Sequence, residues 1–331
     1  MNLRAIVLQA LKERPGEWVS GESLSEILQV SRTTVWKQVK TLIDEGYEVD
    51  SSPKKGYRIT SPADLLSLEE VIPGLATKNF GRGDYFYYRE IDSTNNRART
   101  LASEGYPEGT VVVAEMQTAG RGRRGRSWYS PAQQGIYVSV ILRPVLPLKE
   151  ISRVTLLTAV AVAETLEAEL QLAPHIKWPN DILINNRKIA GILSEAVTDT
   201  DGIEYIVVGI GININNPPRD FPDDFRMEAT SALAEYDRPG SQVQVLQGLL
   251  LNLESRYQEL LAGNFDPILA RVKSLSMVIG QDVRLDKVNG FIIGQAVDID
   301  TSGFLLVRDR EGTLHTIMSG EISILPPASP R

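Results

Sequence analysis

Residues Gly120–Arg126 read Gly-Arg-Gly-Arg-Arg-Gly-Arg, and this stretch decides between two fold classes. It has the G-x-G-x-x-G spacing and follows a predicted strand, Thr110–Glu115, as in dinucleotide-binding domains. Such a domain needs a helix directly after the glycines, whereas residues 127–135 are typical of turns. Four arginines would also crowd a loop that presents bare backbone to a ligand. We therefore exclude a dinucleotide-binding fold.

The composition of this loop predicts an anion-binding site instead. Guanidinium groups are permanently charged planar donors suited to phosphate oxygens, and glycines let the backbone fold closely around a ligand. The four arginines are Arg121, Arg123, Arg124 and Arg126. A solvated basic loop or a nucleic-acid patch stays open as the alternative.

The composition also limits the chemistry. With 331 residues and 42% hydrophobic residues the chain is long enough for two or three packed domains. It has no cysteine, which excludes disulfides, thiolate zinc sites and a cysteine nucleophile. Its only histidines, His175 and His315, are too far apart for a recognisable metal or triad motif, so we expect both to be structural.

The charge and the lack of targeting signals predict a cytoplasmic protein without a membrane partner. We find no secretory signal and no long apolar span. A net charge of −7 argues against a protein that coats nucleic acid, because such binding neutralises many phosphates. Any DNA contact must therefore be local.

The N-terminal region has the pattern of a winged helix-turn-helix. Helical spacing of apolar residues occurs in Leu3–Leu11, after Ser20 and after Ser31. Two short strands, Tyr47–Asp50 and Gly56–Ile59, flank a basic turn. This module predicts DNA binding through the start of the third helix and through the wing. The candidate residues are Ser31, Arg32, Thr33, Thr34, Lys37 and Lys40 in the helix, and Lys54 and Lys55 in the wing.

The charge of this module predicts weak DNA binding by one copy. Residues 31–60 hold six Lys or Arg and four acids, which is +2. Two copies on a palindromic site are therefore expected. A protein-interaction module with the same fold is the alternative.

The rest of the chain predicts a mixed α/β domain followed by a small β-barrel. Strands are expected at Asp84–Arg89, Thr110–Glu115, Ile136–Leu142, Ile182–Ile184 and Ile203–Ile214, and helices at Leu65–Val71, Asn95–Glu104, Ile151–Leu170 and Val243–Leu261. Further short strands are expected at Val283–Asp286, Phe291–Ile299, Phe304–Val307 and Leu314–Ile317. We predict domains over residues 1–62, 63–272 and 273–331.

A second polar motif, Lys177–Asp181, is followed by Lys188. If Asn185 and Asn186 turn the chain back as a hairpin, Asp181 and Lys188 lie side by side. A carboxylate and an ammonium would then meet near one ligand. A surface salt bridge without function is the alternative.

Five motifs together resemble the biotin protein ligase family. The loop Gly120–Arg126 is joined, in the family's order, by Ile91–Asn95, Lys177–Asp181, Lys188–Leu193 and Gly209–Asn213. With its winged helix the chain is similar to the bifunctional bacterial type, which is both ligase and biotin operon repressor. The resemblance covers nearly the whole chain and implies a catalytic domain of the class II synthetase type and an SH3-like barrel.

The resemblance also implies the reaction and the residues that perform it. Biotin and ATP, with Mg²⁺, would give biotinyl-5′-adenylate, and a lysine of a biotin carboxyl carrier protein would then accept the biotin. Arg121, Arg123, Lys188 and Asp181 would be catalytic. Asp181 would lie either near the metal ion or near the incoming lysine, whose proton it could help to remove. The implied biotin contacts are Ser93, Thr94, Asn95, Gln117, Arg121, Gly122, Arg123, Lys188, Gly191 and Gly209, and the implied nucleotide contacts are Trp128, Lys177, Asn180, Gly211 and Asn213.

The resemblance further implies a homodimer, promoted by the adenylate, that binds operator DNA and represses biotin synthesis genes. Two other functions stay open. A ligand-sensing transcription factor without ligase activity would not need the complete loop, Asp181 and Lys188. A lipoate ligase shares the broad catalytic fold, but the chain lacks an Arg-Arg-x-Ser-Gly-Gly run.

Overall fold

The computed structural model describes residues 3–60, 64–198, 200, 202–226, 228–287 and 290–325. The chain divides into two compact units, Met1–Leu65 and Leu66–Arg331. The domain boundary that we predict between residues 62 and 63 lies outside the described residues. The one between 272 and 273 falls within helix α10, Asp266–Leu275. The three domain ranges stay a prediction.

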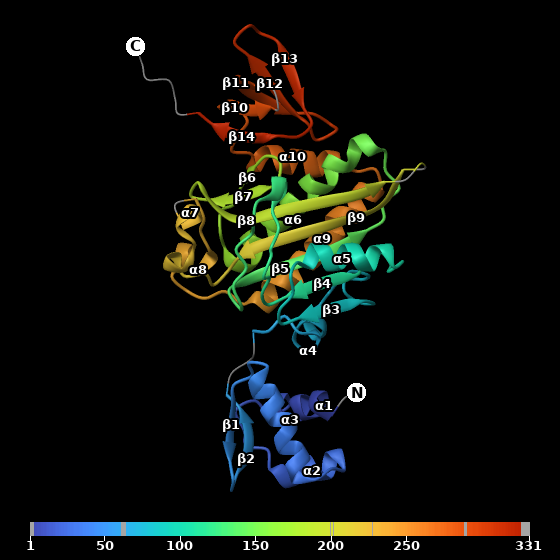
Figure 1. Cartoon of the computed structure of the whole chain (residues 1–331), viewed down its shortest axis with the longest axis vertical. Coiled ribbons are helices and arrows are strands. Elements are labelled where there is room, and N and C mark those ends of the chain that lie inside the picture. The colour runs from blue at the N-terminus through green and yellow to red at the C-terminus, as the bar shows by residue number, and fades with distance from the viewer. Residues whose placement is uncertain are drawn as a thin grey trace. The chain divides into compact units, whose positions relative to one another are not determined.

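The first unit is the winged helix-turn-helix that the sequence predicts (Figure 1). Its elements are α1 (Leu3–Lys12), α2 (Gly21–Leu28), α3 (Arg32–Asp44), β1 (Val49–Ser52) and β2 (Gly56–Ile59). The side chains of Ser20 and Ser31 accept hydrogen bonds from the backbone N–H groups of Ser23 and Thr34 and so cap α2 and α3. Val7, Leu24, Val35 and Leu42 are buried in its core.

A seven-stranded mixed sheet forms the centre of the second unit, in the order β3-β4-β5-β9-β8-β7-β6. Only β3 and β4 run parallel; the remaining neighbours are antiparallel. The strands are β3 (Tyr85–Tyr88), β4 (Val111–Ala114), β5 (Gly135–Leu142), β6 (His175–Lys177), β7 (Asp181–Ile184), β8 (Arg187–Thr198) and β9 (Ile203–Asn213). The predicted mixed α/β class is thus confirmed.

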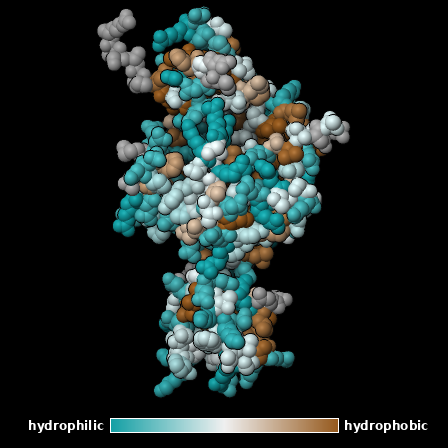
Figure 2. Space-filling model, viewed as in Figure 1, coloured by the Kyte–Doolittle hydropathy of each residue, from teal (hydrophilic) through white to brown (hydrophobic). Residues whose placement is uncertain are grey.

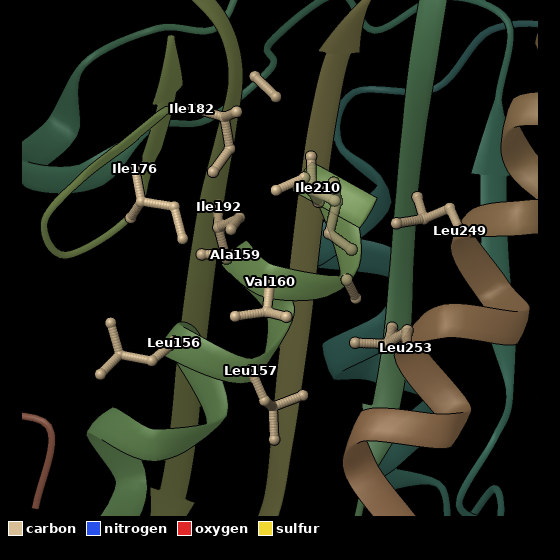
Figure 3. Close-up of a cluster of buried hydrophobic side chains, with 14 of the residues drawn as sticks. Leu156, Leu157, Ala159, Val160, Ile176, Ile182, Ile192, Ile210, Leu249 and Leu253 are labelled. Atoms are coloured by element: carbon tan, nitrogen blue, oxygen red, sulfur yellow. The ribbon is translucent and has the colours of Figure 1, made fainter. Parts of the chain in front are cut away.

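Helices α6 (Ile151–Leu170) and α9 (Gln242–Leu261) cover one face of this sheet, and α5 (Thr94–Ser103) packs against the other. Figure 3 shows Leu157 of α6, Ile210 of β9 and Leu253 of α9 within the first of these layers. Because side chains alternate along a strand, the residues before and after each strand residue that packs on α6 or α9 point to the α5 face.

Short helices and a second sheet complete the unit. The helices are α4 (Leu68–Val71), α7 (Asp223–Arg226), α8 (Ala232–Tyr236) and α10, with 3₁₀ turns at Ile72–Gly74, Arg123–Gly125, Leu148–Glu150 and Pro218–Asp220. The second sheet is antiparallel, in the order β13-β12-β11-β10-β14. Its strands are β10 (Asp282–Lys287), β11 (Gly290–Ile299), β12 (Leu305–Asp309), β13 (Leu314–Ile317) and β14 (Glu321–Ile324).

Six elements were not predicted from the sequence: β6, the full length of β8, the short helices α7 and α8, α10, and β14. On the face of each unit shown in Figure 2, hydrophobic residues are scattered among hydrophilic ones. No helix among the described residues has both the length and the apolar character needed to cross a membrane. His315 is paired with Asp309, with 2.6 Å between Nε2 and Oδ2.

Candidate active site

A compact polar pocket lies where α5 begins. The backbone N–H and the hydroxyl of Thr94 both donate to Gln117 Oε1, at 2.9 and 3.2 Å. The Gln117 amide donates in turn to Ser130 Oγ at 2.9 Å. From the sheet, the buried Ser139 hydroxyl lies 2.8 Å from Thr94 Oγ1 and 2.7 Å from Asn95 Oδ1. Small polar groups are therefore held in fixed directions.

Two glycines of β9 give this pocket its depth. Val208, Ile210 and Ile212 belong to the core on the α6 face, so Gly209 and Gly211 face α5. A Cβ at Gly209 would lie 1.8 Å from Asn95 Oδ1, and a Cβ at Gly211 would lie 2.4 Å from Trp128 Nε1. Any larger residue would displace these side chains.

The loop Gly120–Arg126 crosses this region as a short hairpin. Arg121 and Ser127 form an isolated antiparallel bridge, and the backbone N–H of Gly122 donates to Arg126 O at 2.7 Å. The turn places Arg124 at φ 56° and Gly125 at φ 75°. No dinucleotide-type helix follows, which agrees with the exclusion made from the sequence.

Each arginine of the loop has a partner elsewhere in the second unit. Arg121 forms a bidentate pair with Glu195 of β8, and Arg123 Nη1 donates to Asn180 Oδ1 at 2.8 Å. Arg126 Nη2 lies 2.5 Å and Arg124 Nη1 3.8 Å from the Glu321 carboxylate on β14. The loop is thus attached to the sheet at one end and to the C-terminal strands at the other.

The predicted hairpin between Asp181 and Lys188 is confirmed. Asn185 and Asn186 have φ angles of 49° and 63°, which is the geometry of a type I′ turn. Lys188 Nζ consequently lies 2.7 Å from Asp181 Oδ1, and it also lies 5.4 Å from the centre of the Trp128 ring.

Two cavities meet at this hairpin. All ten residues predicted to bind biotin line the first cavity, which also reaches Trp128, Asn180, Ile192, Leu193, Ile210 and Gly211. The second has a volume of about 590 Å³ and includes Trp128, Lys177, Asn180, Asp181 and Asn213 in its lining. Of the five residues predicted to bind the nucleotide, Gly211 is the one absent from the lining of the second cavity; it lines the first. The cavities share Gly122, Arg123, Trp128, Asn180 and Lys188.

Cationic groups stand at the junction of the cavities. Burial lowers the pKa of Arg123, and the nearby Asp181 carboxylate acts in the opposite direction. A guanidinium remains charged under such a shift. The indole N–H of Trp128 is buried without a hydrogen-bond partner among the described residues, so it is available to a ligand. The junction can bind an anion and exclude water from it.

Four residues of the site are not among the predicted site residues: Ser130, Ser139, Glu195 and Glu321. The two serines belong to the network under α5. The two glutamates hold the loop and come from strands far along the chain.

Family models match three segments of the chain. Residues 3–58 match an HTH domain, residues 87–213 the biotin/lipoate A/B protein ligase family, and residues 278–325 the biotin protein ligase C-terminal domain. The chain is 39% identical to the bifunctional ligase/repressor BirA of Bacillus subtilis (strain 168), over 97% of this chain and 98% of that protein. The chain belongs to the bifunctional biotin ligase/repressor family. It is also 33% identical to the BirA of Escherichia coli (strain K12), over 93% of this chain and 94% of that protein.

A solved biotin protein ligase has the same fold over most of this chain. It is the biotin protein ligase from Aquifex aeolicus in complex with biotin and ATP, with a TM-score of 0.63 and 30% identity. The match covers 73% of this chain and 99% of that one.

In the winged helix, most of the predicted DNA contacts are exposed along α3. Ser31, Arg32, Thr33, Lys37 and Lys40 are exposed, and Thr34 is half-buried beside its capping bond. Lys54 and Lys55 lie in the turn between β1 and β2.

Two tryptophans of this module also lie beside the predicted DNA contacts, although neither was predicted. Trp36 is 51% exposed on α3, and Lys40 Nζ lies 5.6 Å from its ring centre. The Arg58 guanidinium lies 4.9 Å from the centre of the Trp18 ring, and Lys55 Nζ lies 5.6 Å from the same centre. Both aromatic rings therefore lie beside the cations expected to contact DNA.

Proposed function

We propose that the chain is an ATP-dependent biotin protein ligase that also represses transcription. It forms biotinyl-5′-adenylate, transfers biotin to a lysine of a biotin carboxyl carrier protein, and binds operator DNA. The observation that carries the ligase proposal is the junction of the two cavities at Arg123 and Lys188. The narrow polar cavity takes biotin, and the cavity of about 590 Å³ takes ATP.

In the first step a biotin carboxylate oxygen forms a bond to the α-phosphorus of ATP, and the bond from that phosphorus to the bridging oxygen of pyrophosphate breaks. Two anions must approach one another, so the barrier falls when fixed cations neutralise them. Arg123 and Lys188 stand where the cavities meet and perform this role. Arg121 is directed to Glu195, so its part is to hold the loop in place.

In the second step the acceptor amine attacks the carbonyl carbon of the mixed anhydride, AMP leaves, and the amine loses a proton. Asp181 lies at the junction and is paired with Lys188. It lines the second cavity, where it orients the attacking amine and accepts the proton that this amine loses. No covalent bond to the enzyme is needed.

Mg²⁺ belongs to this reaction as part of the nucleotide. Among the described residues no group of three or more His, Cys, Asp or Glu side chains can hold a metal ion. Mg²⁺ commonly binds through substrate phosphates with one or two carboxylates. Asp181 and Asp224 line the nucleotide cavity and fit this requirement. When bound there, the ion neutralises phosphate charge.

Transcriptional repression rests on the winged helix and on a homodimer. The positive charge of α3 and its wing is small, so two copies on a palindromic site supply the affinity. We propose that the adenylate promotes this dimer. If adding biotin and ATP leaves operator binding unchanged in a mobility-shift titration, this part is wrong.

Label transfer tests the ligase proposal. The full chain is incubated with ATP, Mg²⁺, labelled biotin and a purified biotin carboxyl carrier domain. We expect one biotinyl group on one acceptor lysine, and none when ATP is omitted. An unlabelled acceptor together with ligand-dependent DNA binding would favour a sensor without ligase activity.

A further inference from the structure

Glu195 joins the arginine loop to the polar pocket through a single carboxylate. Its Oε1 accepts from Arg121 Nη2 at 2.9 Å. Its Oε2 accepts from Arg121 Nη1 at 3.2 Å and from Asn95 Nδ2 at 3.0 Å. One side chain of β8 therefore contacts both the loop and the floor of the pocket.

The same carboxylate fixes the orientation of the Asn95 amide. A carboxylate only accepts hydrogen bonds, so it selects the rotamer in which Nδ2 faces it. Asn95 Nδ2 is also within 3.3 Å of Leu193 O. The Oδ1 atom is thereby turned toward Ser139 and Gly209, where it is presented as an acceptor. A ureido N–H is a donor and requires such an acceptor.

The pair between Glu195 and Arg121 is suited to opening and closing. Its geometry is bidentate, which gives direction as well as attraction. The side chains are 22% and 38% exposed, so water screens the pair and its rupture costs little. Arg121 also donates to Asn96 Oδ1 at 3.0 Å, on the same helix as Asn95. The loop is thus held at the mouth of the pocket.

We propose that Glu195 is a positioning residue that couples loop closure to biotin binding. It holds the loop Gly120–Arg126 closed through its pair with Arg121, and it orients the Asn95 amide toward the ligand. This inference rests on the proposed biotin ligase function. Glu195 acts through Arg121 and Asn95, and it takes no part in the bond-making step. When biotin engages Asn95, the carboxylate is held in the position that binds Arg121.

Limited trypsin digestion of the full chain measures loop closure directly, because trypsin cleaves after arginine and the loop has four arginines. In the unsubstituted protein, biotin is expected to protect the loop from cleavage. Glu195→Gln leaves one acceptor oxygen for two donor side chains, Arg121 and Asn95, so protection should need about tenfold more biotin. The KM for biotin should rise by a similar factor. The kcat for adenylate formation should stay within about threefold, because Arg123 and Lys188 are unchanged.

Two controls separate the loss of the pair between Glu195 and Arg121 from a general loss of structure. Glu164→Gln removes an acid that pairs with Arg256 on another part of the fold, at 3.0 Å, and should leave protection unchanged. Arg121→Gln should weaken protection as Glu195→Gln does, and the double variant should be no worse than either one alone. Additive losses, or protection of Glu195→Gln at the unsubstituted protein's biotin concentration, would overturn the proposal. Absence of biotin binding by the unsubstituted protein would instead overturn the proposed function.

Discussion

The ammonium of Lys188 lies 2.7 Å from the carboxylate of Asp181, at the point where the two cavities join. The hairpin between them brings the two charges together although six residues separate them in the sequence. In the proposed reaction this pair aligns the amine that faces the reacting anions.

The first prediction concerns that amine. Lys188→Gln should lower the rate of adenylate formation by about 10² or more, the usual loss when one preorganised group that stabilises developing charge is removed. The measurement is single-turnover formation of biotinyl-adenylate. Lys273→Gln is the matched control, since Lys273 pairs with Asp298 at the same distance of 2.7 Å but lines neither cavity. Equal rates for both variants would remove Lys188 from the mechanism.

The second prediction concerns the indole that borders both cavities. A Cβ at Gly211 would lie 2.4 Å from Nε1 and 2.5 Å from Cε2 of Trp128, so Gly211→Ala must move the ring. We expect the KM for ATP to rise about tenfold, which is the loss of about 1.4 kcal/mol of binding. Gly83→Ala is the control, because a Cβ there meets nothing within 4 Å. An unchanged KM in Gly211→Ala would show that the position of Trp128 does not matter for the nucleotide.

The third prediction concerns DNA binding by α3. Trp36→Ala removes the exposed ring that holds Lys40 by a cation–π contact, and it should weaken binding by about threefold at constant salt, which corresponds to about 0.7 kcal/mol. Lys37→Ala should instead lower the slope of log affinity against log salt by about one, because it removes a phosphate contact. Binding is measured with DNA selected by the unsubstituted protein from a random pool. Both variants should keep full ligase activity; a parallel loss of ligase activity would refute a DNA-specific role.

The fourth prediction concerns acid. The hydrogen bond from His315 lowers the pKa of Asp309, which also accepts from the backbone N–H groups of Glu311 and Thr313. Since the pKa is depressed in the folded state, the carboxylate stabilises the fold above its ordinary pKa of about 4, and this contribution is lost as pH falls through the lower folded value. Asp309→Asn should therefore lower the melting temperature at pH 7 and make little difference near pH 2. A gap that widens toward acid would contradict this assignment.

Local patterns predicted the fold where the decisive interactions are close in sequence. The hairpin at Asn185 and Asn186 follows from two residues that tolerate positive φ, and the caps of α2 and α3 follow from Ser20 and Ser31. The ten residues predicted to bind biotin line one cavity. They come together because their motifs lie on the neighbouring strands β8 and β9, at the start of α5 and in the loops beside them. Their roles as ligand contacts stay predictions.

Residues that act across long sequence distances could not be predicted in this way. Glu195 meets Arg121 only because the register of β8 places it beside the loop, 74 positions away. Glu321 meets Arg126 across 195 positions, on a strand that the sequence analysis did not predict. Trp36 could not be predicted for another reason: a tryptophan in a helix is usually buried, and the exposure of its ring is visible only in the fold.

The central claim is that this site activates biotin with ATP. Exchange of labelled pyrophosphate into ATP tests it most directly, with biotin in one arm and lipoate in the other. We predict exchange that depends on biotin and is neither supported nor inhibited by lipoate. Exchange with lipoate alone, or no exchange with biotin, would contradict the account.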